Sequence, residues 1–307
     1  MARLRMTGCR AEGSPENDNS PNTPYNLAMN VAMCQFRPQL GNVAYNVQRI
    51  IEEAIAHPDA NLVVFPELAL TANPVFDDLN IKGFEHVIAE AIHAICKAAT
   101  VKGQCWVVGA PLHTEHGGWY NGCVCVAEGR VVYEYAKQCL PTYDVFNDAR
   151  YFVSGTESGV FEWSGKTIGL LICEDIWADT LPERYTIDPV VQLVGQGIEV
   201  VLHLSSSPFA RNKLALRRAQ IQRCAKVLQV PVVHVNQVGG YTDILFDGQS
   251  MVVAPNGDTV SQCPAFCEAS MAVDVLGLNG ANTTSETLDV DTDVLVLNAL
   301  CYGLREY

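Results

Sequence analysis

The sequence predicts an α/β fold in which helices cover mixed β-sheets, and three observations support this prediction. Short apolar segments rich in β-branched residues alternate with segments of helical periodicity along most of the chain. Two turn signals, Glu128-Gly129 and Asn256-Gly257, indicate hairpins between some of these segments. Hydrophobic residues make up 49% of the 307 residues, which is ample for a packed core. We therefore expect a single α/β domain over residues 29–276 rather than two small domains.

Strands and helices are predicted by different periodicities. The helical segments are 47–55, 84–95 and 214–228, and in the first of them apolar residues recur at the i, i+3, i+4, i+7 spacing of one helix face. The strand-like runs lie at 30–36, 61–67, 104–110, 167–175, 198–206 and 231–238.

The two ends of the chain differ in composition from this central part. Residues 1–28 are rich in Asn, Pro and Ser and contain no apolar segment of signal-peptide length, so we predict a disordered extension, with Met29 as an alternative translation start. Residues 277–293 are polar and acidic and are predicted to form a linker. Residues 294–307 have the pattern of a helix that has just begun, which leads us to expect a further domain downstream.

Charge and cysteine content exclude several classes of protein. The formal net charge of −14 argues against binding to nucleic acid or to an anionic membrane surface. No apolar run approaches the roughly 20 residues of a membrane-spanning helix. The twelve cysteines include no C-x-x-C pair, and without a signal peptide they indicate reduced thiols and a cytoplasmic protein.

A metal site is not expected. The segment "HTEH" at residues 113–116 precedes Gly117-Gly118, which indicates a loop, and no third or fourth ligand is indicated. Cys123 and Cys125 are two residues apart in a predicted strand and should share one face of it. A shared face alone does not make a chelating pair.

Three reactive side chains stand at the ends of predicted strands, where α/β proteins carry their functional groups. Glu67 lies near the end of "LVVFPEL", and Lys137 and Cys173 are the last residues of "VVYEYAK" and "IGLLIC". A glutamate can take the thiol proton, a lysine ammonium can favour the thiolate, and both can assist a tetrahedral intermediate. Each residue also has an ordinary interpretation, as a core cysteine, a helix cap or a surface lysine, and the spacing does not show that they meet.

At these positions the sequence resembles the nitrilase, or carbon–nitrogen hydrolase, superfamily, whose members use a Glu–Lys–Cys triad. Over about residues 30–276 it resembles the glutaminase domain of glutamine-dependent NAD+ synthetases. The segments that carry the resemblance are "FPELALTANP", "KQCLPTYDVFNDARYFVSG", "GLLICEDIW", "SSSPFARNK" and "VNQVGGYTDILFDGQS". The resemblance implies a nitrilase-like α-β-β-α sandwich with mixed sheets.

The resemblance also implies roles for individual residues. Cys173 is the expected nucleophile, Glu67 the general base and acid, and Lys137 the lysine beside the oxyanion. The residues expected to contact glutamine are Tyr143, Asp148, Glu174, Trp177 and either Ser205 or Ser207. Three positions depart from the family pattern, with Asp148 in place of glutamate, His203 in place of asparagine and Asn212 in place of glycine.

The function implied is hydrolysis of the glutamine side-chain amide through a cysteine thioester, which supplies ammonia for NAD+ synthesis. The segment 294–307 resembles the first helix of the synthetase domain, so that domain is the expected partner, downstream or in trans, together with L-glutamine and a homo-oligomeric assembly. No cofactor is expected in this chain, because ATP and magnesium would belong to the synthetase domain.

Two other functions stay open. The chain could be a free-standing amidase for another small amide, or a non-catalytic interaction domain that keeps the fold. A cysteine–histidine hydrolase is disfavoured, because none of the seven histidines lies in a segment typical of that class. His234, within an apolar run, is expected to be a satisfied core residue.

Overall fold

The computed structural model describes residues 28–241, 243–278 and 291–306. The predicted disordered extension therefore lies outside the described residues except for Ala28, and so does most of the predicted acidic linker.

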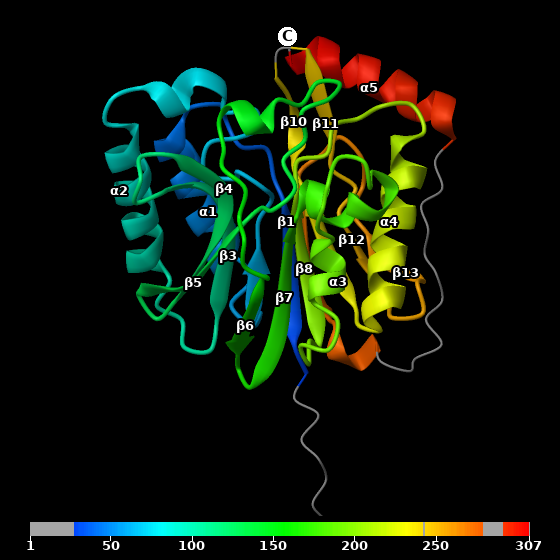
Figure 1. Cartoon of the computed structure of the whole chain (residues 1–307), viewed down its shortest axis with the longest axis horizontal. Helices are drawn as coiled ribbons and strands as arrows, with labels where there is room; N and C mark the ends of the chain where they lie inside the picture. Colours follow the sequence, from blue (N-terminus) through cyan, green and yellow to red (C-terminus); the bar gives the residue numbers. More distant parts are fainter. Residues whose placement is uncertain (1–27, 242, 279–290, 307) are drawn as a thin grey trace, which may run out of the picture.

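Two six-stranded sheets face each other at the centre of the molecule (Figure 1). The first sheet has the order β14-β1-β2-β3-β4-β5. Its strands are β1 (Asn30–Gln35), β2 (Leu62–Val64), β3 (Cys105–His113), β4 (Trp119–Ala127), β5 (Arg130–Ala136) and β14 (Ala269–Asp274). The second sheet has the order β13-β12-β9-β8-β7-β6. Its strands are β6 (Val160–Trp163), β7 (Lys166–Ile172), β8 (Val200–Ser205), β9 (Val232–Asn236), β12 (Met251–Val253) and β13 (Thr259–Gln262).

Both sheets are mixed, as the sequence predicts. Strands β1, β2 and β3 are parallel, and so are β7, β8 and β9, whereas the pairs towards the sheet edges are antiparallel. The two predicted hairpins are present, as β4–β5 and β12–β13. The parallel strands at the centre are buried on both faces, which explains their continuous apolar runs.

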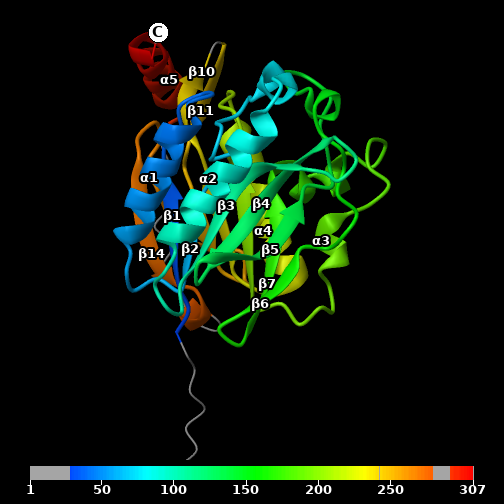
Figure 2. The same ribbon diagram turned by 90° about the vertical axis from the view of Figure 1, so that its left-hand side faces the viewer.

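Helices cover the outer face of each sheet, which gives four layers in the order α-β-β-α (Figures 1 and 2). Helices α1 (Val43–Ile55) and α2 (Phe84–Ala98) lie on the first sheet, and α3 (Pro189–Gln192) and α4 (Lys213–Leu228) lie on the second. The predicted helices correspond to α1, α2 and α4. The first is capped by Asn42, whose side chain accepts a hydrogen bond from the backbone N–H of Tyr45.

The alternation of side chains along each strand divides the core into three parts. In β1, Ala32 and Cys34 face the helices, whereas Val31 and Met33 face the opposite sheet. Cys123 and Cys125 both pack between the sheets, so the prediction that they share a face is confirmed.

Several predicted strands are shorter in the structure. The run 167–175 is a strand only to Ile172, because a 3-10 helix begins at Cys173, and the run 198–206 forms β8 over 200–205. The run 61–67 forms only the three residues of β2, because Pro66 has no N–H to donate to a ladder. The run 231–238 divides after Asn236, and β10 (Val238–Tyr241) pairs with β11 (Ile244–Asp247) in a separate two-stranded sheet. The segment 113–116 lies at the β3–β4 turn, as predicted for a loop.

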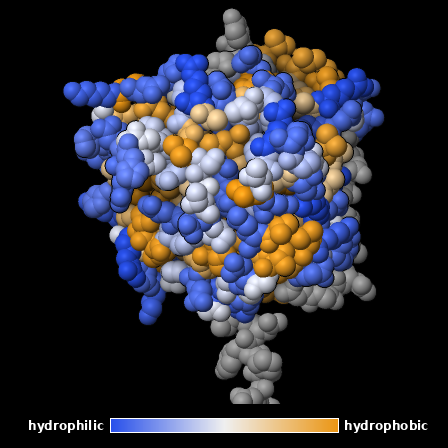
Figure 3. Space-filling model, in the orientation of Figure 1, coloured by the Kyte–Doolittle hydropathy of each residue, from blue (hydrophilic) through white to orange (hydrophobic). Residues whose placement is uncertain are grey.

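Helix α5 (Thr292–Glu306) packs against β10 and β11 at one end of the molecule (Figure 1). It contains the predicted amphipathic segment. Leu295 and Ala299 are buried, whereas the side chains of Leu297, Leu300 and Leu304 are 60–80% exposed. These three leucines contribute to an apolar patch over α5 in the space-filling view (Figure 3).

None of the helices in the described ranges combines the length and the apolar character needed to cross a membrane.

Candidate active site

Cys173 stands where β7 ends and a short 3-10 helix, η3 (Cys173–Ile176), begins. Its backbone φ of +44° is uncommon for a residue other than glycine. The buried carboxylate of Asp175 stabilises this turn by accepting four hydrogen bonds of 2.8–3.0 Å. The donors are the N–H groups of Ile172, Gln138 and Cys139 and the hydroxyl of Tyr135. Burial raises the pKa of Asp175 to about 6, and these hydrogen bonds oppose that rise.

Glu67 and Lys137 form a buried ion pair between Oε1 and Nζ, at 2.8 Å. The same Oε1 accepts a hydrogen bond of 2.8 Å from Asn121, and Oε2 accepts one of 2.7 Å from the N–H of Ser206. Neither Asn121 nor Ser206 was predicted from the sequence. A polar residue in the apolar strand β4 is the signal that could have found Asn121.

The thiol of Cys173 lies within electrostatic range of this ion pair. Burial raises its pKa, Glu67 raises it further, and Lys137 and a hydrogen bond with Ser205 oppose the rise. The net effect is upward, so the thiol is neutral at rest. A neutral thiol needs a general base to become a nucleophile.

Lys137 also binds Asp148, between Nζ and Oδ2, at 2.8 Å. Burial alone would lower the pKa of Lys137, but the carboxylates of Asp148 and Glu67 outweigh it and raise the pKa well above its usual value. Burial raises the pKa of Asp148, and Lys137 opposes this rise. The lysine ammonium is therefore charged and held between two carboxylates.

Several predicted substrate-contact residues surround Glu174, which is buried. Its Oε1 accepts hydrogen bonds from the hydroxyls of Tyr143, at 2.6 Å, and Tyr185, at 3.1 Å. The ammonium of Lys213 lies 4.3 Å from the ring centroid of the half-buried Trp177. The structure thus brings Tyr143 and Glu174 together and places a cation on Trp177.

The two candidate serines occupy different environments. Ser205 ends β8, and its side chain is hydrogen-bonded to Cys173. Ser207 is tied through its backbone N–H to Oδ1 of Asn236, at 2.8 Å. The hydroxyl beside the thiol is therefore that of Ser205.

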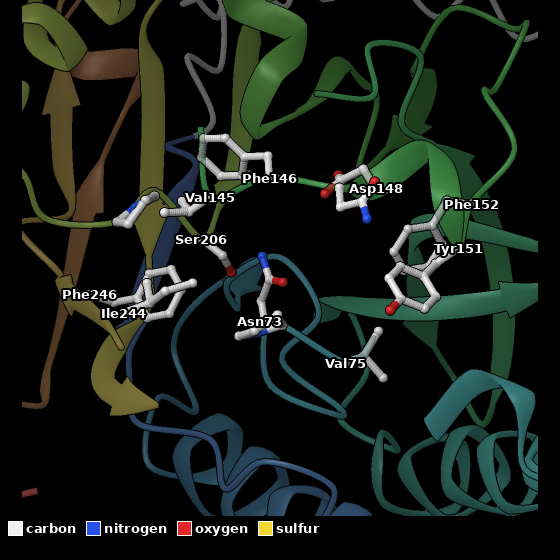
Figure 4. Close-up of a pocket in the computed structure, with 13 residues that line it drawn as sticks. Asn73, Val75, Val145, Phe146, Asp148, Tyr151, Phe152, Ser206, Ile244 and Phe246 are labelled. Carbon is white, nitrogen blue, oxygen red and sulfur yellow. The ribbon is translucent and has the colours of Figure 1, made fainter. Parts of the chain in front are cut away.

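A small cavity of about 50 Å³ lies next to this cluster. Asp148 and Ser206 line it, and both contact the Glu67–Lys137 ion pair. Figure 4 shows Asp148, Ser206 and Asn73 around its centre, with aromatic side chains on both sides. Cys173 is not among the residues that line it.

The two remaining departures from the family pattern have physical consequences. Asn212 precedes α4 with φ of +67°, in the left-handed region that favours glycine and, after it, asparagine. His203 is buried, and its Nε2 contacts the backbone oxygen of Cys173 at 3.1 Å rather than the thiol. His234 is also buried, but it is not fully satisfied as predicted, because its Nε2 has no hydrogen-bond partner in the part of the chain that the structure describes.

Within the part of the chain that the structure describes, one group of side chains has the composition and spacing of a metal site. The ligand atoms of Cys34, Glu53 and His57 lie within 4.8 Å of one another. Glu53 is already paired with Arg49 at 2.8 Å, so its charge is partly neutralised. This group lies between β1 and the end of α1, apart from the Cys173 cluster.

Comparison with known proteins identifies the family. The carbon–nitrogen hydrolase family model matches residues 30–276. A glutamine-dependent NAD+ synthetase from Acinetobacter baylyi is 36% identical over 240 residues, which are 78% of this chain and 42% of that protein. The synthetase from Synechocystis is 33% identical over 291 residues, which are 90% of this chain and 52% of that protein. The chain thus spans about half the length of the curated relatives it matches.

The solved structures agree with this assignment. Glutamine-dependent NAD+ synthetase from Acinetobacter baumannii, determined with ADP, has a TM-score of 0.82 and 33% identity, and the match covers 91% of this chain and 52% of that one. An amidase of the nitrilase superfamily from Nesterenkonia has a TM-score of 0.69 at 20% identity, over 82% of this chain and 92% of that one, and shows the shared fold. The α-β-β-α sandwich expected from the sequence is confirmed, and the chain belongs to the carbon–nitrogen hydrolase family.

Proposed function

We propose that this chain is the glutaminase component of a glutamine-dependent NAD+ synthetase. It would hydrolyse the side-chain amide of L-glutamine and supply ammonia for the amidation of deamido-NAD+ by a synthetase domain. The observation that carries the proposal is the buried cluster of Glu67, Lys137 and Cys173, in a fold shared with synthetases of about twice this length.

In the proposed mechanism, Glu67 takes the thiol proton while the sulfur of Cys173 attacks the amide carbon of glutamine. Lys137 and the N–H of Glu174 stabilise the negative charge that develops on the amide oxygen. The C–N bond then breaks, ammonia leaves with the proton held by Glu67, and a γ-glutamyl thioester remains. Water, deprotonated by Glu67, adds to the thioester and releases glutamate and the thiol.

The same cluster suggests how glutamine is held. We assign its contacts to Tyr143, Glu174, Trp177 and Ser205, with Ser207 as the alternative serine. Asp148 remains our candidate for the α-amino group. Its ion pair with Lys137 means that substrate must share this carboxylate with the lysine.

Partners and location form the remaining part of the proposal. We assign ATP and magnesium to the synthetase domain and no cofactor to this chain. We also propose residues 29–276 as the hydrolase domain, residues 294–307 as the first helix of the synthetase domain, a homo-oligomeric assembly and a cytoplasmic location. The free thiols in the described ranges support a reducing compartment.

The test is release of glutamate and ammonia from L-glutamine by the purified chain. Cys173→Ala should abolish release, whereas Cys267→Ser, at an exposed cysteine, should leave it unchanged. If the wild type is silent, the synthetase domain is added in trans, and recovery supports the proposal. Preference for another amide in a substrate panel would favour the free-standing amidase, and silence on every amide by well-folded protein would favour the interaction domain. A γ-glutamyl adduct mapped to any residue other than Cys173 would overturn the mechanism.

A further inference from the structure

Two buried histidines from neighbouring strands connect to the backbone of Cys173. His203 in β8 and His234 in β9 are directly paired in the parallel ladder. Their Nδ1 atoms lie 2.9 Å apart, and Nε2 of His203 lies 3.1 Å from the carbonyl oxygen of Cys173. The two histidine side chains and Cys173 are each at most 4% exposed.

The chemistry of these contacts fixes where the protons are. A carbonyl oxygen can only accept, so Nε2 of His203 carries a proton and donates it. In a neutral imidazole the other nitrogen is then an acceptor, so Nδ1 of His234 must donate to Nδ1 of His203. Nε2 of His234 is left without a proton, and this atom has no hydrogen-bond partner among the described residues. Burial lowers the pKa of His203 to about 4 and holds the pKa of His234 well below its usual value, so both rings are neutral at pH 7.

The carbonyl that His203 holds belongs to the peptide between Cys173 and Glu174. A trans peptide is planar, and its C=O and N–H point in opposite directions. A hydrogen bond that fixes the Cys173 carbonyl therefore also fixes the direction of the Glu174 N–H. That N–H is the backbone group assigned to the oxyanion in the proposed mechanism.

We propose that His203, held in one tautomer by His234, is a positioning residue that orients the peptide N–H of Glu174 towards the oxyanion. The inference rests on the proposed function for the identity of the substrate, but not for the acyl chemistry at Cys173. Cys173 has an uncommon backbone conformation, φ of +44°, and such conformations persist where surrounding contacts determine them. Asp175 fixes one side of this turn, and His203 fixes the other.

The test compares two reactions of the same thiol. Acylation by p-nitrophenyl acetate passes through a tetrahedral oxyanion, forms the S–C bond of a thioester and releases p-nitrophenolate. Alkylation by iodoacetamide is a direct displacement of iodide that has no such oxyanion. A residue that positions the N–H should affect acylation, whereas a general structural defect should affect both reactions.

Matched variants separate the hydrogen bond from the volume of the side chain. His203→Gln keeps an N–H donor at the same number of bonds from the backbone as Nε2, and His203→Leu removes the donor. We expect the leucine variant to lose about 10- to 100-fold in the acylation rate constant of Cys173, and in kcat for glutamine with KM nearly unchanged. Alkylation should change less than about threefold, and glutamine at position 203 should restore most of the acylation. His234→Asn keeps a donor near the position of Nδ1, so it should react more like the wild type than His234→Leu does.

Equal losses in acylation and alkylation, or normal acylation in His203→Leu, would overturn the inference. Melting temperatures accompany each measurement, and the ratio of the two rate constants remains informative in a destabilised variant. If the variants show the expected acylation pattern but the wild type does not hydrolyse glutamine, either alone or with the synthetase domain in trans, the proposed substrate is rejected and this positioning role remains supported.

Discussion

Replacing Lys137 by methionine should destabilise the protein strongly at neutral pH and much less in acid. Methionine keeps most of the length and volume of lysine but removes the ammonium. That ammonium lies 2.8 Å from an oxygen of Glu67 and 2.8 Å from an oxygen of Asp148. Without it, two carboxylates face each other in a region where the Lys137 and Glu67 side chains are at most 2% exposed.

The expected loss of stability follows from leaving a buried carboxylate without its counterion. Removing one partner of a buried ion pair costs about 3–5 kcal/mol, because the remaining charge has lost both water and its counterion. For a chain of this size that corresponds to a decrease of about 5–8 °C in melting temperature. The wild-type lysine opposes the rise in the pKa of Asp148 that burial causes, so in Lys137→Met that pKa rises further.

The pH dependence has a defined sign. A carboxyl whose pKa is raised in the folded state destabilises the protein above that pKa, and protonation relieves the penalty as pH falls through it. The difference in unfolding free energy between wild type and Lys137→Met should therefore be large at pH 8 and decrease towards pH 5, as measured by urea denaturation. Glu67→Gln in the Lys137→Met background should recover part of the loss at pH 8. A difference that is the same at both pH values, or absent at both, would refute the reasoning.

Three further predictions follow from other parts of the structure. Arg217 and Asp247 form a buried, bidentate ion pair with hydrogen bonds of 3.0 and 2.8 Å. Arg217→Met should therefore lower the free energy of unfolding, measured by urea denaturation, by about 3–5 kcal/mol, and a loss below about 1 kcal/mol would contradict this. The pKa of His203 in the folded state, about 4, lies below its ordinary value of 6.5, so the unfolded state takes up a proton first as pH falls. The wild type should consequently lose about 3 kcal/mol more stability than His203→Gln between pH 7 and pH 4, and equal losses would show that this histidine does not titrate as described. On α5, Leu295 is buried and Leu300 is exposed. Leu295→Ala should lower the free energy of unfolding by about 2–4 kcal/mol, whereas Leu300→Ala should change it by less than about 0.5 kcal/mol. Similar losses in the two variants would mean that the exposed face of α5 is covered.

The fold was accessible from the sequence because its signals are local. Helices α1 and α2 each present a regular apolar face, and the hairpin between β4 and β5 is marked by Glu128-Gly129. The pairing of β10 with β11 was missed, because the run 231–238 passes through Asn236 and Gln237 with no glycine or proline to mark a break between the two strands. The backbone N–H of Gln237 donates a hydrogen bond to the carbonyl oxygen of Ser205, and the carbonyl oxygen of Gln237 accepts one from the N–H of Gly248. Contacts with residues distant in sequence therefore end the strand at this point.

The candidate site was accessible only in part. Glu67, Lys137 and Cys173 each follow a strand, but these strands belong to two different sheets, and no spacing along the chain encodes how the sheets face each other. The prediction that the three residues meet came from the resemblance to the family. The contact between Asp148 and Lys137 has no signal in the sequence, because a loop of irregular structure joins the two residues.

The electrostatics of the cluster restrict when the thiol can react. One lysine cation stands between two carboxylates, so the three groups together carry a net charge of −1 beside Cys173. That charge and the burial of the thiol both disfavour a thiolate in the resting protein. His203 cannot act as its base, because its donor nitrogen is bonded to the backbone oxygen of Cys173 and its other nitrogen accepts from His234. In the proposed mechanism the nucleophile therefore forms by proton transfer within the cluster as the substrate carbonyl arrives. Glu67, held by Asn121, Lys137 and Ser206, is the carboxylate that we propose takes that proton.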